Sequence, residues 1–329
     1  MKRLGTRKKA ALRTDLAAIL NLVTFYRYQN LIEKSAVTMD TLQKPLIAYG
    51  WLRAILCFIF FIIIYVLLSA IAGPLLHHKS GGDASQFFAA GSMGNLFLMV
   101  LIVNFSFFLS AWLFRKFIDK KTFFSLGFQW EARFVRTGLL TALGVIGIGS
   151  FLLWLIGDLK FIGAQFDLAS FMFNLLLFLI VATGEELFFR GYILNNLLQS
   201  FNKWIALAAS ALLFMLVHLQ NPGATESLLP ILSAFIGGIL FGINYVYTKN
   251  LWYGICLHFT WNYLQGPILG YDVSGTTSKP ILIHTLSGPP LITGGVFGYE
   301  GSLFCVLLSA LAIAILVWRY GRNHGVLTV

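Results

Sequence analysis

Stretches of about 20 apolar residues recur along this chain, and they limit its fold more than any other feature. Each stretch can cross about 30 Å of hydrocarbon as a helix, because a helix rises about 1.5 Å per residue. Of the 329 residues, 58% are hydrophobic and only 11% are charged, whereas soluble proteins carry about 25% charged residues. The composition therefore excludes a soluble enzyme, a secreted disulfide scaffold and a disordered chain. It predicts an all-α, polytopic membrane protein.

We expect a bundle of about eight transmembrane helices. The predicted spans cover residues 51–72, 93–114, 137–157, 168–199, 204–220, 229–247, 251–269 and 302–319. A four-helix catalytic core is expected at residues 158–270. A basic cytoplasmic segment at 1–50 and three spans at 51–157 precede this core, and an outer loop with the last span, at 271–329, follows it.

The net charge of +11 is explained by the topology of these spans. With both termini on one side of the membrane, 21 of the 24 Lys and Arg residues fall on that side. Only Lys79, Lys160 and Lys279 fall on the other side. Because cytoplasmic loops carry the excess of Lys and Arg, we expect a multi-pass protein of a cell membrane, the bacterial inner membrane in particular, with both termini cytoplasmic. The charge then requires no nucleic-acid partner.

A few polar side chains fall inside the predicted hydrocarbon region, between the fourth and seventh spans. An ionisable group in the bilayer costs several kcal/mol unless it is paired or hydrated, so such residues usually serve a function. The residues concerned are Glu185, Glu186, Arg190, His218, His258 and Asn262.

Helix geometry predicts that these side chains can meet. Glu185 lies about 16 residues before the turn that joins the fourth and fifth spans, and His218 lies about 16 residues after it, so both are about 24 Å from that turn. His258 and Asn262 lie about 13 and 19 Å from the turn before their own span. We therefore expect one shared site within the membrane.

The spacing within each helix separates two roles. Glu186 and Arg190 are four residues apart, which favours a structural ion pair. Glu185 points about 100° away around the helix and is free for catalysis. His258 and Asn262 are also four apart and can direct donors at one point. A carboxylate and an imidazole that face a second imidazole and an amide can carry out water-mediated acyl hydrolysis.

Three motifs in this order carry a resemblance to a known family. They are Glu-Glu-x-x-x-Arg at 185–190, Phe-x-x-x-His at 214–218 and His-x-x-x-Asn at 258–262. The set resembles the CPBP family, which contains the type II CAAX prenyl endopeptidases and the bacteriocin-processing or Abi proteins. The resemblance covers the fourth to the seventh span and implies an intramembrane endopeptidase with a glutamate-type mechanism.

The resemblance also implies roles for the site residues. Glu185 and His218 activate water, while His258 and Asn262 stabilise the oxyanion. Glu186 and Arg190 support the site. The expected substrate is a membrane-associated peptide or protein, cut at or near the cytoplasmic half of the bilayer.

A metalloprotease is the alternative catalytic type. Glu185, His218 and His258 resemble a hydrolytic zinc ligand set. However, the chain has no His-Glu-x-x-His helix, and the nearby arginine disfavours a bound dication. The three cysteines lie inside predicted spans without metal-binding spacing, so neither a disulfide framework nor a thiolate site is expected. We therefore expect no cofactor, with zinc as the alternative.

Two functions from other classes stay open. A secondary transporter also places carboxylates near the midplane of the membrane, but this chain shows no repeated halves. A catalytically silent membrane scaffold, or a bacteriocin-immunity protein of the same fold, is the second alternative, because a fold does not guarantee activity. Neutralising Glu185 separates a protease from a scaffold.

Overall fold

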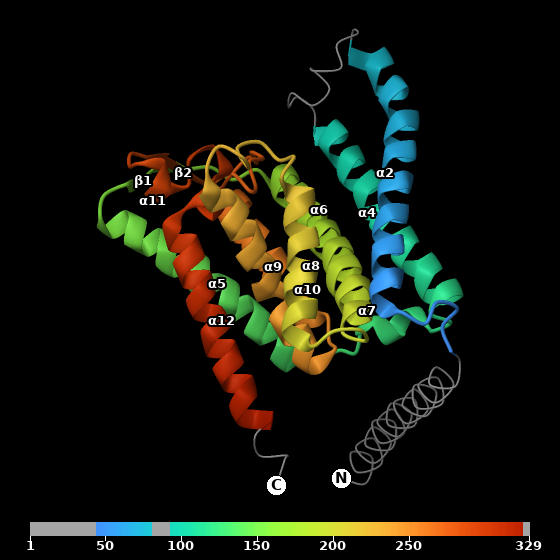
Figure 1. The fold of residues 1–329 in the computed structure, drawn as a ribbon. Coiled ribbons are helices and arrows are strands. Elements are labelled where there is room, and N and C mark those ends of the chain that lie inside the picture. Colours follow the sequence, from blue (N-terminus) through green and yellow to red (C-terminus); the bar gives the residue numbers. More distant parts are fainter. Residues whose placement is uncertain (1–43, 81–92, 325–329) are drawn as a thin grey trace, which may run out of the picture.

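The apolar stretches form helices in the computed structural model, which describes residues 44–80 and 93–324. The predicted basic segment at 1–50 therefore lies almost entirely outside the described residues. Eight helical runs lie where the spans are predicted (Figure 1). They are α2 (Gly50–Ser80), α4 (Met93–Leu113) with η1 (Phe114–Ile118), α5 (Ala132–Leu155), α6 (Leu168–Glu186) with η3 (Leu187–Leu194) and α7 (Asn195–Leu197), α8 (Lys203–His218), α9 (Leu228–Thr248), α10 (Trp252–Tyr263) with η4 (Leu264–Ile268), and α12 (Leu303–His324).

Six of the described helices are long and apolar enough to cross a membrane, which is the pattern of a polytopic, all-α membrane protein. The other two of the eight predicted spans correspond to shorter helices. The helix α8 has 16 residues and α10 has 12 before its π-helical extension, and a span needs about 20. Hydropathy alone extended these two helices into their flanking loops, because those loops are apolar as well.

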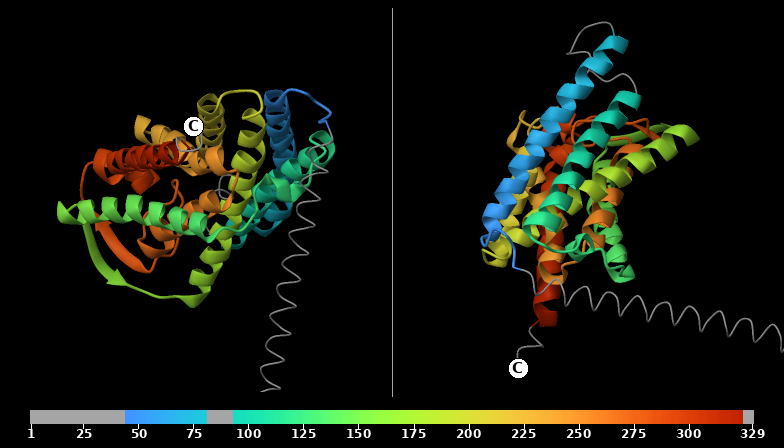
Figure 2. Two further views of the ribbon diagram at one scale, coloured as in Figure 1. Left: turned by 90° about the horizontal axis from the view of Figure 1, so that it is seen from below. Right: turned by 90° about the vertical axis from the view of Figure 1, so that its right-hand side faces the viewer.

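The helices pack as one bundle with apolar side chains on both its inside and its outside. The helix α10 packs against α5, α6 and α9, and α8 and α12 each pack against α9. The helices α2 and α4 lie side by side at one flank (Figure 2). Large side chains such as Ile59, Phe151 and Leu179 point outward and are 44–55% exposed. An apolar outer surface of this kind is expected of a protein that faces lipid rather than water.

The loops gather at two opposite ends of the bundle (Figure 1). The end that we call the strand end holds residues 156–167, 219–227 and 269–302. The end that we call the basic end holds residues 114–131, 195–203 and 249–251. The short elements of the basic end include η2 (Phe123–Leu126), and those of the strand end are β1 (Leu159–Ala164), β2 (Leu282–Leu286), α11 (Pro290–Thr293), η5 (Gly295–Phe297) and η6 (Tyr299–Gly301).

The strand end is more ordered than the expected outer loop. The strands β1 and β2 pair antiparallel, with Leu159 opposite Leu286. Residues 269–302 fold back over the bundle, and Gly298 makes this possible. Its φ is +82°, and a Cβ there would lie 2.0 Å from the carbonyl oxygen of Asp272. Only glycine fits this backbone conformation and this close approach.

A polar contact at the strand end anchors the start of α6. Asp167 is its N-cap residue and accepts a hydrogen bond from the amide of Ala169 at 3.1 Å. Lys279 donates to the same carboxylate at 2.7 Å. This hydrogen bond, together with those from Ser170 and Ala169, lowers the pKa of Asp167 to about 2. The beginning of the helix that carries Glu185 is thereby tied to the loop that follows α10.

A buried charge cluster joins the N-terminal helices to the core at the basic end. Asp119 is fully buried and accepts from Arg53 at 2.7 Å and from Arg115 at 3.0 Å. Tyr192 and Asn196 donate to the same carboxylate at 3.3 and 3.4 Å. One carboxylate therefore connects α2 and η1 with the end of the helix that carries Glu185 and Glu186.

Candidate active site

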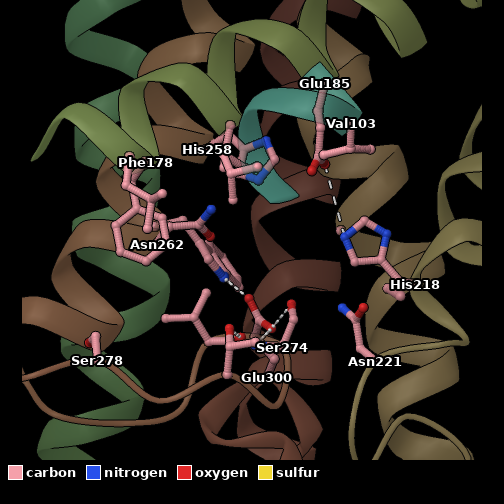
Figure 3. A pocket seen from close by; sticks show the side chains of 18 of the residues that line it. Val103, Phe178, Glu185, His218, Asn221, His258, Asn262, Ser274, Ser278 and Glu300 are labelled. Carbon is pink, nitrogen blue, oxygen red and sulfur yellow. Dashed lines mark hydrogen bonds and ion pairs between the residues drawn. The ribbon is translucent and has the colours of Figure 1, made fainter. Parts of the chain in front are cut away.

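A cavity of about 230 Å³ lies between α4, α6, α8, α9, α10 and the strand end (Figure 3). Four of the six predicted site residues line it: Glu185, His218, His258 and Asn262. They come from α6, α8 and α10, as the helix geometry predicted. Glu186 and Arg190 do not line the cavity, and their side chains are buried behind its wall.

Glu185 and His218 face each other across the cavity (Figure 3). The Nε2 atom of His218 lies 3.9 Å from Oε2 of Glu185, which is longer than a hydrogen bond. The Nδ1 atom of His218 lies 2.8 Å from the carbonyl oxygen of Phe214. A carbonyl oxygen can only accept, so Nδ1 carries the hydrogen, and in a neutral ring Nε2 keeps its lone pair. Two acceptor atoms therefore face each other in the cavity.

His258 is held from behind by a carboxylate. Its Nδ1 atom lies 3.2 Å from Oε1 of Glu186, and Arg190 donates to the same oxygen at 2.7 Å. Arg190 also donates to the carbonyl oxygen of Gly238 at 3.0 Å. The expected ion pair of Glu186 and Arg190 is present, and its contact with His258 is an addition that spacing did not predict. Because the carboxylate accepts from Nδ1, the Nε2 atom of His258 is left for the cavity.

The π-helix η3 follows directly after the two glutamates. All eight of its residues, Leu187–Leu194, are buried. π-helical turns inside α-helices often occur at functional sites. The wider turn begins directly after Glu185, which lines the cavity, and Glu186, which contacts His258 of α10. The predicted positions assume an ideal helical period of 3.6 residues, which does not include this widening of the helix.

Aromatic rings fix the positions of both histidines. The rings of Phe214 and His218 have centroids 4.3 Å apart, and those of Phe241 and His258 are 4.8 Å apart. The guanidinium of Arg190 lies over the ring of Phe214 at 4.5 Å. Phe214 is therefore a buried core residue, and its ring contacts both His218 and Arg190.

The approach of α10 to Glu186 depends on Gly254. A Cβ atom at this position would lie 2.5 Å from Oε2 of Glu186 and 3.2 Å from the carbonyl oxygen of Phe241. Real Cβ atoms do not come this close to a fixed carboxylate. The contact between Glu186 and His258, one turn further along α10, therefore requires a residue without a side chain here.

Sequence reasoning missed the polar loop residues of the cavity wall, among them Glu300, Ser274 and Asn221. Glu300 accepts from the indole nitrogen of Trp261 at 2.7 Å, and from the amide and hydroxyl of Ser274 at 2.9 and 2.6 Å. Asn221 lines the same wall. These residues lie in loops, where no periodic pattern marks a residue that turns inward. Glu300 ties the strand end to Trp261, the neighbour of Asn262.

Asn104 of α4 also lines the cavity, although it lies outside the predicted core. Its side-chain nitrogen donates to the carbonyl oxygen of Val100 on its own helix at 2.8 Å. Its oxygen is buried without a partner and lines the cavity next to Gly184. The helix α4 thus adds a polar atom to the site from outside the predicted core.

The three residues of the zinc alternative all line the cavity. The described residues contain no group of three or more His, Cys, Asp or Glu side chains close enough together to hold a metal ion. His218 and His258 each engage Nδ1 with a protein oxygen, which leaves Nε2 of each ring toward the cavity, and Nε2 of His218 lies 3.9 Å from Glu185. The absence of a cofactor stays a prediction.

Comparison with known proteins identifies the central part of the chain. Residues 167–264 match the family model described as type II CAAX prenyl endopeptidase Rce1-like. The match runs from the N-cap of α6 to the end of α10 and includes all three motifs. No curated protein in the comparison matches the chain. The segment that carries all six predicted site residues in this multi-pass membrane protein is thus similar to the type II CAAX prenyl endopeptidases.

Proposed function

We propose that this protein is an intramembrane endopeptidase that hydrolyses a peptide bond of a membrane-associated protein or peptide. The observation that carries the proposal is the pair of Glu185 and His218, whose acceptor atoms face each other 3.9 Å apart in a cavity within the bundle. The family match supports the same class of reaction. No metal or other cofactor is part of the proposal.

The two acceptors can position and activate one water molecule. A water can donate one hydrogen to the Glu185 carboxylate and the other to Nε2 of His218. As its oxygen attacks the carbonyl carbon, one of these groups takes a proton, and the C–N bond then breaks as that proton passes to the leaving nitrogen. Proton transfer by a positioned group contributes about 10²- to 10⁴-fold to the rate of such reactions.

His258 and Asn262 can stabilise the negative charge that develops on the carbonyl oxygen. Asn262 has an amide N–H group to donate. His258 can donate from Nε2 when its ring is protonated, and the contact of Glu186 with Nδ1 fixes the orientation of the ring. Each donor of this kind is worth about 10²- to 10³-fold in rate, because it is fixed before the reaction begins.

A comparison of protein termini in native membranes tests the proposal without knowledge of the substrate. Membranes that contain the wild-type protein are compared with membranes that contain the Glu185→Gln variant at equal expression. We expect new peptide termini with the wild type that are absent with the variant. The Glu226→Gln variant, which changes an exposed carboxylate in a loop of the strand end, is the matched control and should give the wild-type termini.

The same experiment separates the protease from a silent scaffold. A scaffold or immunity protein keeps its cellular effect when Glu185 is replaced, and the termini are the same in both membranes. That outcome, with the variant folded and present in the membrane, would contradict the proposed function.

A further inference from the structure

The cavity lies in the half of the bundle that is nearest to the strand end. On α4 its lining residues lie between Leu96 and Asn104, and on α6 they lie between Asn174 and Glu185. Both stretches precede the part of each helix that approaches the basic end. On α8 the lining residues are Phe214 and His218, in the last turn before the strand end.

The loops that border the cavity belong to the strand end as well. They contribute Asn221, residues 273–278 and Glu300, among others. No residue of the basic end lines the cavity. In the direction of the basic end, α6 continues as η3, where Phe188 and Phe189 are fully buried. The described side chains of η3 therefore pack inside the bundle between the site and the basic end.

The charge distribution gives the two ends an orientation. Among the described residues, 12 Lys and Arg lie at or near the basic end, at positions 44, 53, 115, 116, 120, 121, 133, 136, 203, 249, 319 and 322, and three, Lys79, Lys160 and Lys279, lie toward the opposite end. Lys and Arg follow the cytoplasmic side, so the basic end is cytoplasmic and the strand end faces the opposite side.

We propose that the site is reached from the non-cytoplasmic face of the membrane, and that its substrates are peptide segments exposed on that face. The route of access is a property of the fold, whereas the cleavage of these segments rests on the proposed function. This location differs from the cytoplasmic half expected from the sequence. That expectation was stated together with the family resemblance and did not consider which end of the bundle borders the site.

The walls of the cavity indicate which chemistry the segment presents. One wall consists of aliphatic and aromatic side chains of α4 and α6, such as Val100, Val103 and Phe178. The wall of the strand end offers the hydroxyl and amide groups of Ser274, Thr276, Thr277 and Asn221. An extended peptide at the membrane surface fits both walls, with apolar side chains toward the helices and backbone amides toward the hydroxyl groups. The substrate class is therefore an extended segment where a membrane-associated protein leaves the bilayer on its non-cytoplasmic side.

Accessibility of single cysteines tests the route of access. The reporter in the cavity is the Ala234→Cys variant, because Ala234 lines the cavity on α9 and cysteine is only slightly larger. Intact cells and inverted membrane vesicles are treated with a small, charged methanethiosulfonate, and the remaining free thiol is measured after denaturation. The wild-type protein gives the background from Cys57, Cys256 and Cys305, of which two are buried and one is intermediate.

Three matched variants make the result readable. The Glu226→Cys variant marks the strand end and the Lys203→Cys variant marks the basic end, and both positions are exposed. The Ala310→Cys variant is the control for lipid exposure. Ala310 lies seven residues into α12, at a depth similar to that of Ala234, which lies six residues into α9. Unlike Ala234, Ala310 is exposed on the outside of the bundle and does not line the cavity. This variant should not react from either side, because a charged reagent does not enter lipid.

The expected result is loss of the free thiol in intact cells for the variants at positions 234 and 226, with loss at position 203 only in inverted vesicles. Protection of position 234 in intact cells, or reaction of position 203 in intact cells, would overturn the proposal. Because labelling needs no turnover, the result does not depend on whether the protein is a protease. If the labelling is as expected and Glu185 changes no termini, only the proposed function fails. If termini change but map to cytoplasmic segments, the substrate class proposed above fails.

Discussion

At the scale of single residues, the site is built from two carboxylates with different partners. Glu185 lines the cavity, while Glu186 is fully buried and contacts Arg190 and His258 through one oxygen. The two neighbours in the sequence therefore differ in environment. On this ground the proposed mechanism gives the reacting water to Glu185 and the positioning of His258 to Glu186.

The Glu186→Gln variant tests this division of roles. A glutamine can still accept one hydrogen bond, but it leaves Arg190 buried without a charged partner. Loss of one partner of a buried pair costs about 3–5 kcal/mol of folding free energy. We expect a lower unfolding temperature in detergent and, at permissive temperature, slower cleavage because His258 has lost the carboxylate that orients its ring. Cleavage at the wild-type rate at permissive temperature would mean that Glu186 acts only through stability.

Sequence reasoning at this scale reached the residues of the motifs and not their neighbours. The order and helical spacing of Glu185, His218, His258 and Asn262 were enough to predict that they share one site, and all four line one cavity. Their catalytic roles stay predictions. The contact of Glu186 with His258 was missed because it depends on how α6 and α10 are rotated against each other. The inward turn of Glu300 was missed because a loop has no period.

At the scale of elements, short helices and a π-helix shape the site. The helix α8 ends at His218 itself, so its last turn borders the cavity, and the carbonyl oxygen of Phe214 accepts from Nδ1 of His218. Hydropathy located every long described helix, with ends that differ by at most eight residues, because a lipid-facing helix must be apolar along its whole length. It overlooked β1 and β2, which are short, and it could not indicate where η3 widens the helix.

The contact between α10 and α6 is tested with the Gly254→Ala variant. The added methyl group must displace either Glu186 or α10, and overpacking of this kind costs about 1–3 kcal/mol. We expect lower stability together with a loss of cleavage, since His258 lies on the displaced helix. The matched control is the Gly147→Ala variant on α5, where a Cβ meets nothing within 4 Å. It should keep its activity and be equally stable or slightly more stable, because alanine favours a helix. Equal behaviour of the two variants would exclude the proposed close contact.

At the scale of the whole molecule, the two ends of the bundle have different tasks. The loops of the strand end border the cavity, and the basic end holds the N-terminal helices against the core. Asp119 is the centre of the basic end, since it pairs with Arg53 of α2 and with Arg115 of η1. The buried cluster lies far along α6 from Glu185 and does not line the cavity.

The Asp119→Ala variant is expected to lower stability without a direct effect on the chemistry. It leaves two buried arginines unpaired, at a cost of about 3–5 kcal/mol. The Glu131→Ala variant removes an exposed pair with Arg133 and should cost less than about 1 kcal/mol. Thermal unfolding in detergent measures both, and cleavage at low temperature should persist in both variants. A stable Asp119→Ala variant would mean that the cluster does not hold the N-terminal helices in place.

The central claim, that Glu185 and His218 act on one water molecule, is tested most directly by a double-mutant kinetic cycle. The purified wild type and the Glu185→Gln, His218→Ala and double variants are compared in proteoliposomes, with a peptide that contains a cleavage site found in native membranes. Groups that act as a unit are strongly non-additive. We predict that each single variant loses about 10²- to 10⁴-fold in kcat, and that the double variant is no slower than the slower single variant. Losses that multiply in the double variant, or a Glu185→Gln variant that cleaves at the wild-type rate, would contradict the account.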